Sequence, residues 1–348
     1  MGIGRPRSAR GWLAWGALVV LVLLVLGATR RNREQAVLPA SPEPTPTTSV
    51  GSGTPISTPE TPSILPVDRP PPGESRAALD IDGRNRGWRL YVPRSLAQIG
   101  DVALVIGLHG GLGSGEQFAA DAFFDSQAER GGFIAVYPDG ISRGRLLDAR
   151  TWNAGGCCGT AMNEGIDDIA FIAALVERLA AELPVDRDRV YVTGHSNGAM
   201  MAQRLACDRA DLFAAIAVYS GPLQTVCAPS EPISVLNIHG DADQNIPIGG
   251  GNGPRAITDT DYVSLEETVS TWVALNGCAT ALTANLEGPV TTSFWTDCRD
   301  GVVVGTQVVA GASHAWPGGA PTGPLRADPS PDLDASSAIW DFLADKVR

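Results

Sequence analysis

A serine within a short glycine pattern is the first residue whose type and surroundings indicate chemistry. Ser196 lies in Gly194-His195-Ser196-Asn197-Gly198, between a predicted strand at Val190–Thr193 and a predicted helix at Ala199–Cys207. In this setting the glycines permit a tight strand-to-helix turn that lifts the serine hydroxyl above a sheet. We interpret Ser196 as a nucleophile; the alternative is a glycine-serine turn without chemistry.

A serine hydroxyl needs a base to accept its proton, and the chain has four histidines. His195 lies inside the turn, and His109 and His239 each follow a predicted strand, so we expect structural roles for these three. His314 lies in a loop of small residues, Gly311–Trp316, which can approach the serine closely. The chain order serine, acid, histidine also favours His314 as the base.

The acid that orients the histidine is expected between Ser196 and His314 in the sequence. The predicted strand Val235–Ile238 is followed by a loop that holds both Asp241 and Asp243. We favour Asp243, which lies further along the loop and can reach the histidine, and we expect Asp241 to cap its own turn. The acid would fix the histidine tautomer and stabilise the imidazolium.

Two backbone N–H groups are expected to form an oxyanion hole. One belongs to Asn197, directly after the nucleophile, and the other to Gly111 in the glycine-rich stretch Leu108–Gly113. This stretch lacks the Gly-Lys-Ser/Thr of a phosphate loop and fits no dinucleotide fingerprint. No set of His, Cys and acids has metal-ligand spacing. We therefore expect neither a cofactor nor a metal.

Five segments, taken together, resemble a known family. They are Leu108–Gly111 (LHGG), Thr151–Gly159 (TWNAGGCCG), Gly194–Met201 (GHSNGAMM), Ile238–Asp243 (IHGDAD) and Gly311–Gly319 (GASHAWPGG). As an ordered set between about residue 77 and residue 348, they resemble the extracellular polyhydroxybutyrate depolymerase and feruloyl esterase family of α/β-hydrolases. The resemblance implies a carboxylic ester hydrolase with the triad Ser196, Asp243 and His314.

The acid loop departs from the pattern of that family, in which it resembles HGTAD followed by a VPY-like run. Here Asp241 stands at the Thr position, and Ile246-Pro247-Ile248 replaces VPY. The second aspartate remains the match to the family acid. Two nearby carboxylates can raise one another's pKa, so we expect altered electrostatics in this loop.

Two tryptophans flank the expected cleft in the sequence. Trp152 and Trp316 are candidates for an aromatic wall against an acyl or phenolic group. The alternative is core packing, because tryptophan is often largely buried.

Hydrophobic patterning predicts the elements that must position these residues. Strands are predicted at Ala77–Ile81, Trp88–Val92, Val102–Leu108, Phe133–Tyr137, Val190–Thr193, Ala214–Tyr219, Val235–Ile238 and Val302–Val309. Helices are predicted at Gln117–Arg130, Gly165–Leu183, Ala199–Cys207, Ser264–Leu275 and Ala335–Val347. Two early hairpin-like strands followed by β-α alternation predict a mostly parallel sheet flanked by helices, in a single domain. The resemblance implies that this domain is catalytic and has the α/β-hydrolase fold.

Three regions divide the chain. Residues 11–28 are uncharged and follow three arginines. This pattern predicts that residues 1–34 are a membrane-targeting segment, either a signal anchor or a cleaved signal peptide. Residues 35–75 are rich in Pro, Ser and Thr and predict an extended stalk. Residues 76–348 are the expected catalytic domain. Either form of the leader places this domain outside the cytoplasm.

The charge balance excludes one class of partner. Residues 35–348 hold 20 basic and 37 acidic residues, a formal net charge of −17. A polyanion would meet a repulsive field, so we expect no nucleic acid partner. The expected partners are an ester substrate and, through the N-terminal segment alone, a membrane; the oligomeric state stays open.

Six cysteines, an even number in an exported chain, predict disulfides. We predict Cys278–Cys298, which would support the strand that leads to His314, and next Cys207–Cys227. Cys157 and Cys158 can bridge each other or pair elsewhere, and this choice stays open. Zinc is disfavoured because no closely spaced C-x-x-C pair occurs.

The favoured function is an extracytoplasmic serine esterase that acts on hydroxyalkanoate, feruloyl or acetyl polysaccharide, or small aryl esters. An acyltransferase would use the same triad and differ in its acceptor. A non-catalytic cell-surface binding module is the alternative of a different class, against which the intact triad argues. Because no polymer-binding domain follows residue 348, we favour soluble or short-chain esters.

Overall fold

The computed structural model describes residues 71–98, 100–142, 149–279, 283–320 and 328–348. By internal contacts the chain divides into Met1–Ser63 and Ile64–Arg348, and all described residues belong to the second unit. The predicted membrane segment at residues 11–28 lies outside the described residues, as does the Pro-rich stretch up to residue 70. Within the described ranges, no helix is long and apolar enough to span a bilayer.

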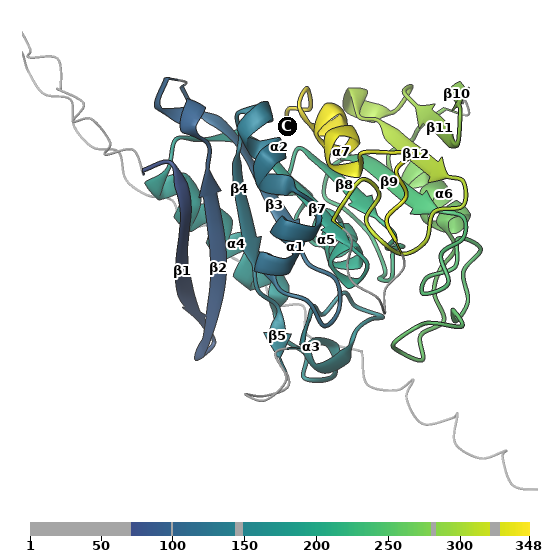
Figure 1. Ribbon diagram of the computed structural model, residues 1–348, viewed down its shortest axis with the longest axis horizontal. Helices are drawn as coiled ribbons and strands as arrows, with labels where there is room; N and C mark the ends of the chain where they lie inside the picture. Colours follow the sequence, from purple (N-terminus) through teal and green to yellow (C-terminus); the bar gives the residue numbers. More distant parts are fainter. Residues whose placement is uncertain (1–70, 99, 143–148, 280–282, 321–327) are drawn as a thin grey trace, which may run out of the picture. The chain divides into compact units, whose positions relative to one another are not determined.

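One large sheet organises this unit (Figure 1). Its ten strands follow the order β1-β2-β4-β3-β7-β8-β9-β12-β11-β10. They are β1 (Gly73–Ile81), β2 (Arg84–Val92), β3 (Val102–Leu108), β4 (Ile134–Pro138), β7 (Val185–His195), β8 (Ala215–Tyr219), β9 (Ser234–Gly240), β10 (Thr283–Glu287), β11 (Val290–Trp295) and β12 (Val304–Val309). The six central strands, from β4 to β12, are parallel, and the pairs at both edges are antiparallel. A short hairpin of β5 (Ile141–Ser142) and β6 (Arg150–Thr151) stands apart.

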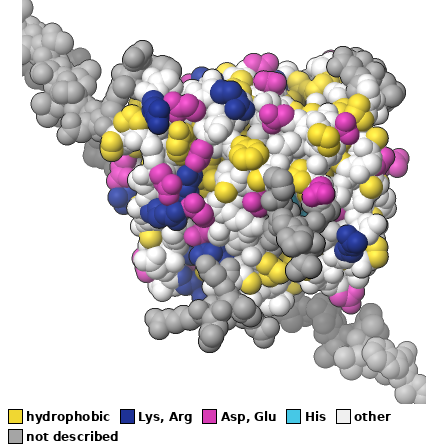
Figure 2. Space-filling model, in the orientation of Figure 1, with side chains coloured by type: hydrophobic (Ala, Val, Ile, Leu, Met, Phe, Trp, Pro, Cys, Tyr) yellow, Lys and Arg dark blue, Asp and Glu magenta, His cyan; other side chains and the backbone are white. Residues whose placement is uncertain are grey.

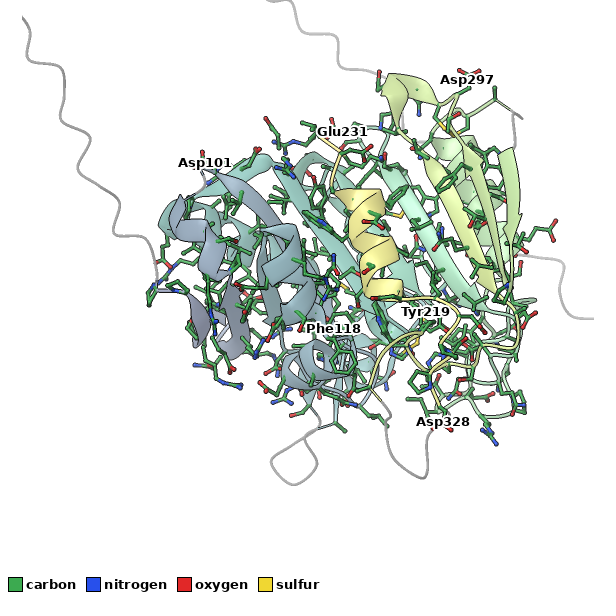
Figure 3. All side chains as sticks on the ribbon, turned by 45° about the horizontal axis from the view of Figure 1, so that its top comes forward. Asp101, Phe118, Tyr219, Glu231, Asp297 and Asp328 are labelled. Atoms are coloured by element: carbon green, nitrogen blue, oxygen red, sulfur yellow. A yellow bond between two sulfur atoms is a disulfide. The ribbon has the colours of Figure 1, made fainter. Side chains whose placement is uncertain are left out.

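Seven α-helices lie among the described residues. They are α1 (Gly115–Asp121), α2 (Phe124–Gly131), α3 (Gly159–Asn163), α4 (Asp168–Glu182), α5 (Asn197–Asp208), α6 (Leu265–Leu275) and α7 (Ala335–Leu343). The central strands β3, β4, β8 and β9 are buried along their whole length, which continuous Val, Ile, Leu and Ala runs permit. One apolar core contains side chains of α4, α5 and α6, and a second contains side chains of α1, α2 and α7. The sheet is therefore covered on both faces, and α7 crosses its front in Figure 3.

The predicted helix Gln117–Arg130 is wrong in one respect, because it is two helices. The chain breaks between α1 and α2 at Phe123, whose φ of 49° is left-handed. The break leaves the Ala122 carbonyl free to accept a hydrogen bond from Ser336 and buries Phe124 completely. Ser336 lies 214 residues away in the sequence, so helical periodicity alone does not reveal the break.

Other boundaries differ from the predictions by smaller amounts. Strand β1 begins at Gly73, three residues before the expected domain start at Arg76. The last helix ends at Leu343 instead of Val347. Strand β10, of mixed polarity, was absent from the predicted elements.

Three disulfides are present. The structure pairs Cys278 with Cys298 and Cys207 with Cys227, as the sequence predicts. The open choice is resolved as a bridge between the neighbouring Cys157 and Cys158. The Cys278–Cys298 bridge joins the chain just after α6 to the connection between β11 and β12, and the Cys207–Cys227 bridge attaches the end of α5 to the segment after β8.

Candidate active site

Five neighbouring parallel strands place polar residues at one edge of the sheet. His109 follows β3, Ser196 follows β7 and Ser220 follows β8, while the loops after β9 and β12 carry Asp243 and His314. The carboxyl ends of parallel strands meet at the same edge, which is where sites form in open α/β sheets. Figure 3 shows the ends of these strands near the labelled Tyr219.

Ser196 occupies a strained turn between β7 and α5. Its backbone has φ 56° and ψ −122°, a conformation that L-residues rarely adopt. A Cβ on Gly194 would lie 2.6 Å from the carbonyl carbon of Gly198, and a Cβ on Gly198 would overlap the backbone of Leu108. The Ser196 N–H donates to the Tyr219 carbonyl at 3.1 Å. The close backbone approach therefore explains both glycines of the motif.

The three residues of the predicted triad lie in hydrogen-bond contact. His314 Nε2 is 2.9 Å from the hydroxyl oxygen of Ser196, and His314 Nδ1 is 2.7 Å from Asp243 Oδ2. With Nδ1–H donating to the carboxylate, Nε2 is left to accept the serine proton. The Asp243 side chain is buried, whereas the His314 side chain keeps 19% of its exposure.

Asp243 is held as a carboxylate. Burial alone would raise its pKa, but hydrogen bonds from His314 and Ser220 and the backbone N–H of Ile246 outweigh burial and hold the pKa well below the ordinary value. Its other oxygen accepts the N–H groups of Asn245 at 2.8 Å and Ile246 at 3.0 Å. The expectation that two nearby aspartates raise one another's pKa is therefore wrong for Asp243.

Asp241 has a different task from the predicted one. Instead of capping its own turn, its Oδ1 accepts the N–H of Gly311 at 2.6 Å. Gly311 begins the loop that carries His314, so Asp241 fastens this loop to the one after β9. The prediction failed because the partner lies 70 residues away in the sequence.

Two aromatic side chains fix the backbone of the histidine loop. The His195 ring lies with Nε2 2.8 Å from the His314 carbonyl oxygen, and this nitrogen donates its proton there. The Tyr219 hydroxyl donates to the Ser313 carbonyl. His195 also stacks on Tyr219, with ring centroids 5.7 Å apart. His195 thus contacts the backbone of the loop that carries His314, in keeping with the structural role expected for it.

Ser220 is a residue that the sequence analysis missed. It is fully buried, its φ is 53°, and its hydroxyl donates to Asp243 Oδ2. The same oxygen is 2.9 Å from His314 Nδ1. Ser220 therefore contacts both Asp243 and His314. One signal for it was present: a small polar residue directly after a strand that neighbours the nucleophile strand.

His109 orients a peptide bond beside the nucleophile. The Gly140 N–H donates to His109 Nε2 at 3.0 Å, so the proton of the ring is on Nδ1, which donates to the Gly110 carbonyl at 2.8 Å. Burial lowers the pKa of His109 to about 4, which keeps the ring neutral. In a trans peptide the Gly111 N–H points away from the fixed Gly110 carbonyl.

The two predicted oxyanion residues lie side by side. A Cβ on Gly111 would be 3.8 Å from the Cβ of Asn197, and Asn197 is the first residue of α5, where N–H groups have no intrahelical acceptor. The Asn197 side-chain amide binds Trp152 twice, accepting its N–H at 2.7 Å and donating to its carbonyl at 3.0 Å.

The two tryptophans behave differently. Trp152 is completely buried, and its indole N–H donates to the His109 carbonyl, so it supports the glycine loop from below and forms no wall of the cleft. That prediction is wrong, because proximity in a motif does not tell which way a side chain points. Trp316 does line the cleft, with its ring edge-on to Phe118 at 5.2 Å.

A cleft of about 450 Å³ opens above these residues. It is lined by Ser196 and His314, by Phe118 and Asp121 of helix α1, and by residues 255–257 of the segment after the acid loop. Acidic and basic side chains are intermingled on the face shown in Figure 2, without a continuous basic surface. In the described part of the chain, no group of three or more His, Cys, Asp or Glu side chains is arranged to hold a metal ion.

Sequence comparisons identify relatives. A sequence model of the family described as esterase PHB depolymerase matches residues 87–248. NocK of Nocardia uniformis subsp. tsuyamanensis, described as an esterase, is 30% identical over an alignment of 328 residues that covers 86% of this chain and 89% of that protein. Feruloyl esterase B of Piromyces equi is 28% identical over 222 residues, which cover 61% of this chain and 39% of that protein.

A solved structure shares the fold. An acetyl xylan esterase from Aspergillus awamori aligns with a TM-score of 0.54 at 19% identity, over 78% of this chain and 98% of that one. Together with the mostly parallel sheet flanked by helices, this likeness confirms the predicted α/β-hydrolase fold.

Proposed function

The chain belongs to the esterase PHB depolymerase family and is a carboxylic ester hydrolase, and from that premise we propose that it cleaves esters through an acyl-enzyme formed on Ser196. One observation supports this mechanism above the others: the unbroken chain of hydrogen bonds from Ser196 through His314 to Asp243. It ends on a carboxylate whose pKa is held low, so the acid stays charged while the histidine gains and loses a proton.

In the first half-reaction, the Ser196 oxygen attacks the ester carbonyl carbon while its proton moves to His314 Nε2. The tetrahedral intermediate collapses when that proton passes to the alcohol oxygen, so the C–O bond breaks and the acyl group stays on Ser196. In the second half-reaction, water gives a proton to Nε2 and attacks the acyl carbon. Ser196 leaves with this proton, and the carboxylic acid is released.

The negative charge on the tetrahedral oxygen needs donors that are in place beforehand. We assign them to the backbone N–H groups of Gly111 and Asn197. The neutral ring of His109 holds the peptide before Gly111, and Trp152 holds the side chain of Asn197. Loss of one such donor typically lowers turnover about 10²- to 10³-fold.

We place the enzyme outside the cytoplasm, since all six cysteines are paired and disulfides persist in oxidising compartments. The cleft of about 450 Å³ supports small or short-chain esters as substrates, among them feruloyl, acetyl and hydroxyalkanoate esters. An alcohol acceptor in place of water would make the same acyl-enzyme a transferase.

A fluorophosphonate probe tests the nucleophile directly. We expect the probe to add covalently to Ser196, as located by mass spectrometry, and to abolish hydrolysis of 4-nitrophenyl acetate. Ser196→Ala is expected to take up no probe and to lose about 10⁴- to 10⁶-fold in turnover with its thermal unfolding unchanged. Ser337→Ala, on α7, is the matched control. Labelling at another residue, or turnover within tenfold of the parent, would overturn the proposal. Addition of butanol separates acceptors: butyl ester formation in excess of hydrolysis identifies a transferase.

A further inference from the structure

The segment after the acid loop forms one wall of the cleft and is fixed to that loop. The Arg255 N–H donates to the Gln244 carbonyl at 2.9 Å, and the Asn245 side chain donates to the Arg255 carbonyl at 2.9 Å. A Cβ on Gly253 would lie 2.5 Å from the Asn245 carbonyl oxygen, so only glycine allows this close approach. Because the Asn245 N–H also binds Asp243, the backbone of Arg255 is tied to the catalytic acid.

Arg255 and Ile257 line the same cleft as Ser196. Ile257 reaches the oxyanion loop, since a Cβ on Gly111 would be 3.4 Å from its terminal methyl carbon. Leu112, which directly follows Gly111 in that loop, also lines the cleft. Leu112 and Ile257 keep 53% and 60% of their exposure, although both are large and apolar. The mouth of the cleft thus offers apolar contacts beside one cation.

The guanidinium of Arg255 forms no ion pair or side-chain hydrogen bond with any described residue, and this distinguishes it from most described arginines. Arg86, for example, is paired with Asp168 at 2.6 Å, and Arg209 with Asp211 at 2.9 Å. The nearby Asp259 is instead bound by Asn252 at 2.8 Å. In a chain with 38 acidic and 26 basic residues, an arginine left without a carboxylate in an active-site wall is available to a ligand.

We propose, on the basis of the function above, that Arg255 binds a carboxylate of the substrate, so that the preferred esters carry a free carboxylate at the end of a short apolar chain. A guanidinium donates two parallel hydrogen bonds to a carboxylate. A phosphate or sulfate dianion fits less well, because Arg255 is the one Lys or Arg among the described cleft residues and the carboxylate of Asp121 lines the same cleft. The apolar chain would lie between Leu112 and Ile257.

Matched ester pairs test this inference with the full chain. The first pair is monomethyl adipate and methyl hexanoate, which place the charge on the acyl side. The second pair is 4-acetoxybutanoate and butyl acetate, which place it on the alcohol side. We expect the ratio of kcat/KM between charged and neutral esters to exceed one in at least one pair. In Arg255→Gln that ratio falls about tenfold, mainly through KM, because a charge-assisted hydrogen bond is lost.

Two further variants separate this role from a general charge effect. Arg255→Lys keeps the positive charge but cannot form the bidentate pair of hydrogen bonds, so it is expected to retain part of the preference for charged over neutral esters. Arg178→Gln, on α4 and outside the cleft lining, changes the net charge equally and leaves the ratio unchanged. A ratio that moves less than twofold in Arg255→Gln, with neutral esters still cleaved, overturns the carboxylate proposal and leaves the esterase intact. Absence of all hydrolysis would instead overturn the proposed function.

Discussion

On the nucleophile side of the site, close backbone contacts set the position of Ser196, whereas on the histidine side hydrogen bonds between side chains and loops set the position of His314. The turn that carries Ser196 contains Gly194 and Gly198, which lie against neighbouring backbone, where a single added carbon has no room. The histidine loop is instead fastened by Asp241, His195 and Tyr219, each through one hydrogen bond.

This difference predicts two kinds of response to mutation. Steric contacts between backbone segments cannot relax unless whole strands move. Added side-chain atoms on the nucleophile side are therefore expected to lower the free energy of unfolding. Hydrogen bonds can be removed one at a time. Each substitution on the histidine side is therefore expected to lower turnover by its own separate amount. Four predictions test the contrast, in decreasing order of expected effect.

Replacing the two aspartates of the acid loop separately gives the largest contrast. Asp243→Asn removes the charge that stabilises the imidazolium and disturbs the tautomer, so kcat is expected to fall about 10³- to 10⁴-fold. Asp241→Asn keeps an oxygen that can accept the Gly311 N–H, so kcat is expected to stay within about fivefold. Steady-state kinetics on 4-nitrophenyl acetate decide the matter, and a larger loss in Asp241→Asn would reverse the assignment of the acid.

Gly198→Ala tests the steric side. The new Cβ would overlap the Leu108 carbonyl and lie 2.5 Å from the His109 carbonyl oxygen, so we expect the free energy of unfolding to fall by about 3 kcal/mol or more. Gly249→Ala is the matched control, because a Cβ there meets nothing within 4 Å. Urea titration measures both. Equal free energies of unfolding in the two variants would show that these backbone contacts do not stabilise the turn that carries Ser196.

The buried His109 makes the nucleophile side sensitive to acid. Its folded pKa of about 4 lies below the unfolded value of 6.5, so the unfolded chain binds more protons between these values. Stability is therefore complete above pH 6.5 and is lost progressively as the pH falls towards 4, by at most on the order of 3 kcal/mol. Burial also lowers the pKa of His239, which adds to the same trend.

Two measurements check the acid sensitivity. The imidazole resonances of His109 are expected to titrate near pH 4 in the folded protein. In His109→Gln the slope of unfolding free energy against pH is expected to become shallower between pH 4.5 and 6.5. Titration of the ring near pH 6.5 in the folded state would contradict the prediction.

Ser220 gives the smallest expected effect and tests the histidine side. Ser220→Ala removes the hydroxyl that contacts Asp243 and His314, so kcat is expected to fall about 10-fold with KM within twofold, as for loss of one hydrogen bond to a charged group. Ser220→Gly removes the same hydroxyl while relieving the positive φ. Equal losses in both variants assign the effect to the hydroxyl, whereas recovery in the glycine variant would assign it to backbone strain.

Local motifs were sufficient to predict the sheet, the disulfides Cys207–Cys227 and Cys278–Cys298, and which loops meet at the site. The mostly parallel character of the sheet follows from β-α alternation. Chain order favoured His314, and Asp243 was chosen for its place further along the acid loop. Contacts between distant segments were beyond such patterns. The partner of Asp241 belongs to another loop, and the burial of Trp152 depends on Asn197 and His109. Ser220 was missed because no motif contains it, although its place after β8 is informative.

Tyr219 has a consequence for motion within the site. Its carbonyl accepts the Ser196 N–H, and its hydroxyl donates to the Ser313 carbonyl, next to His314. One residue at the end of β8 is therefore attached both to the nucleophile turn and to the histidine loop. When thermal fluctuation displaces this strand, the serine and the histidine travel with it, so their separation changes less than the position of either one. We therefore expect bending of the sheet to disturb the hydrogen bond between Ser196 and His314, the proposed path of the proton, less than it moves either residue.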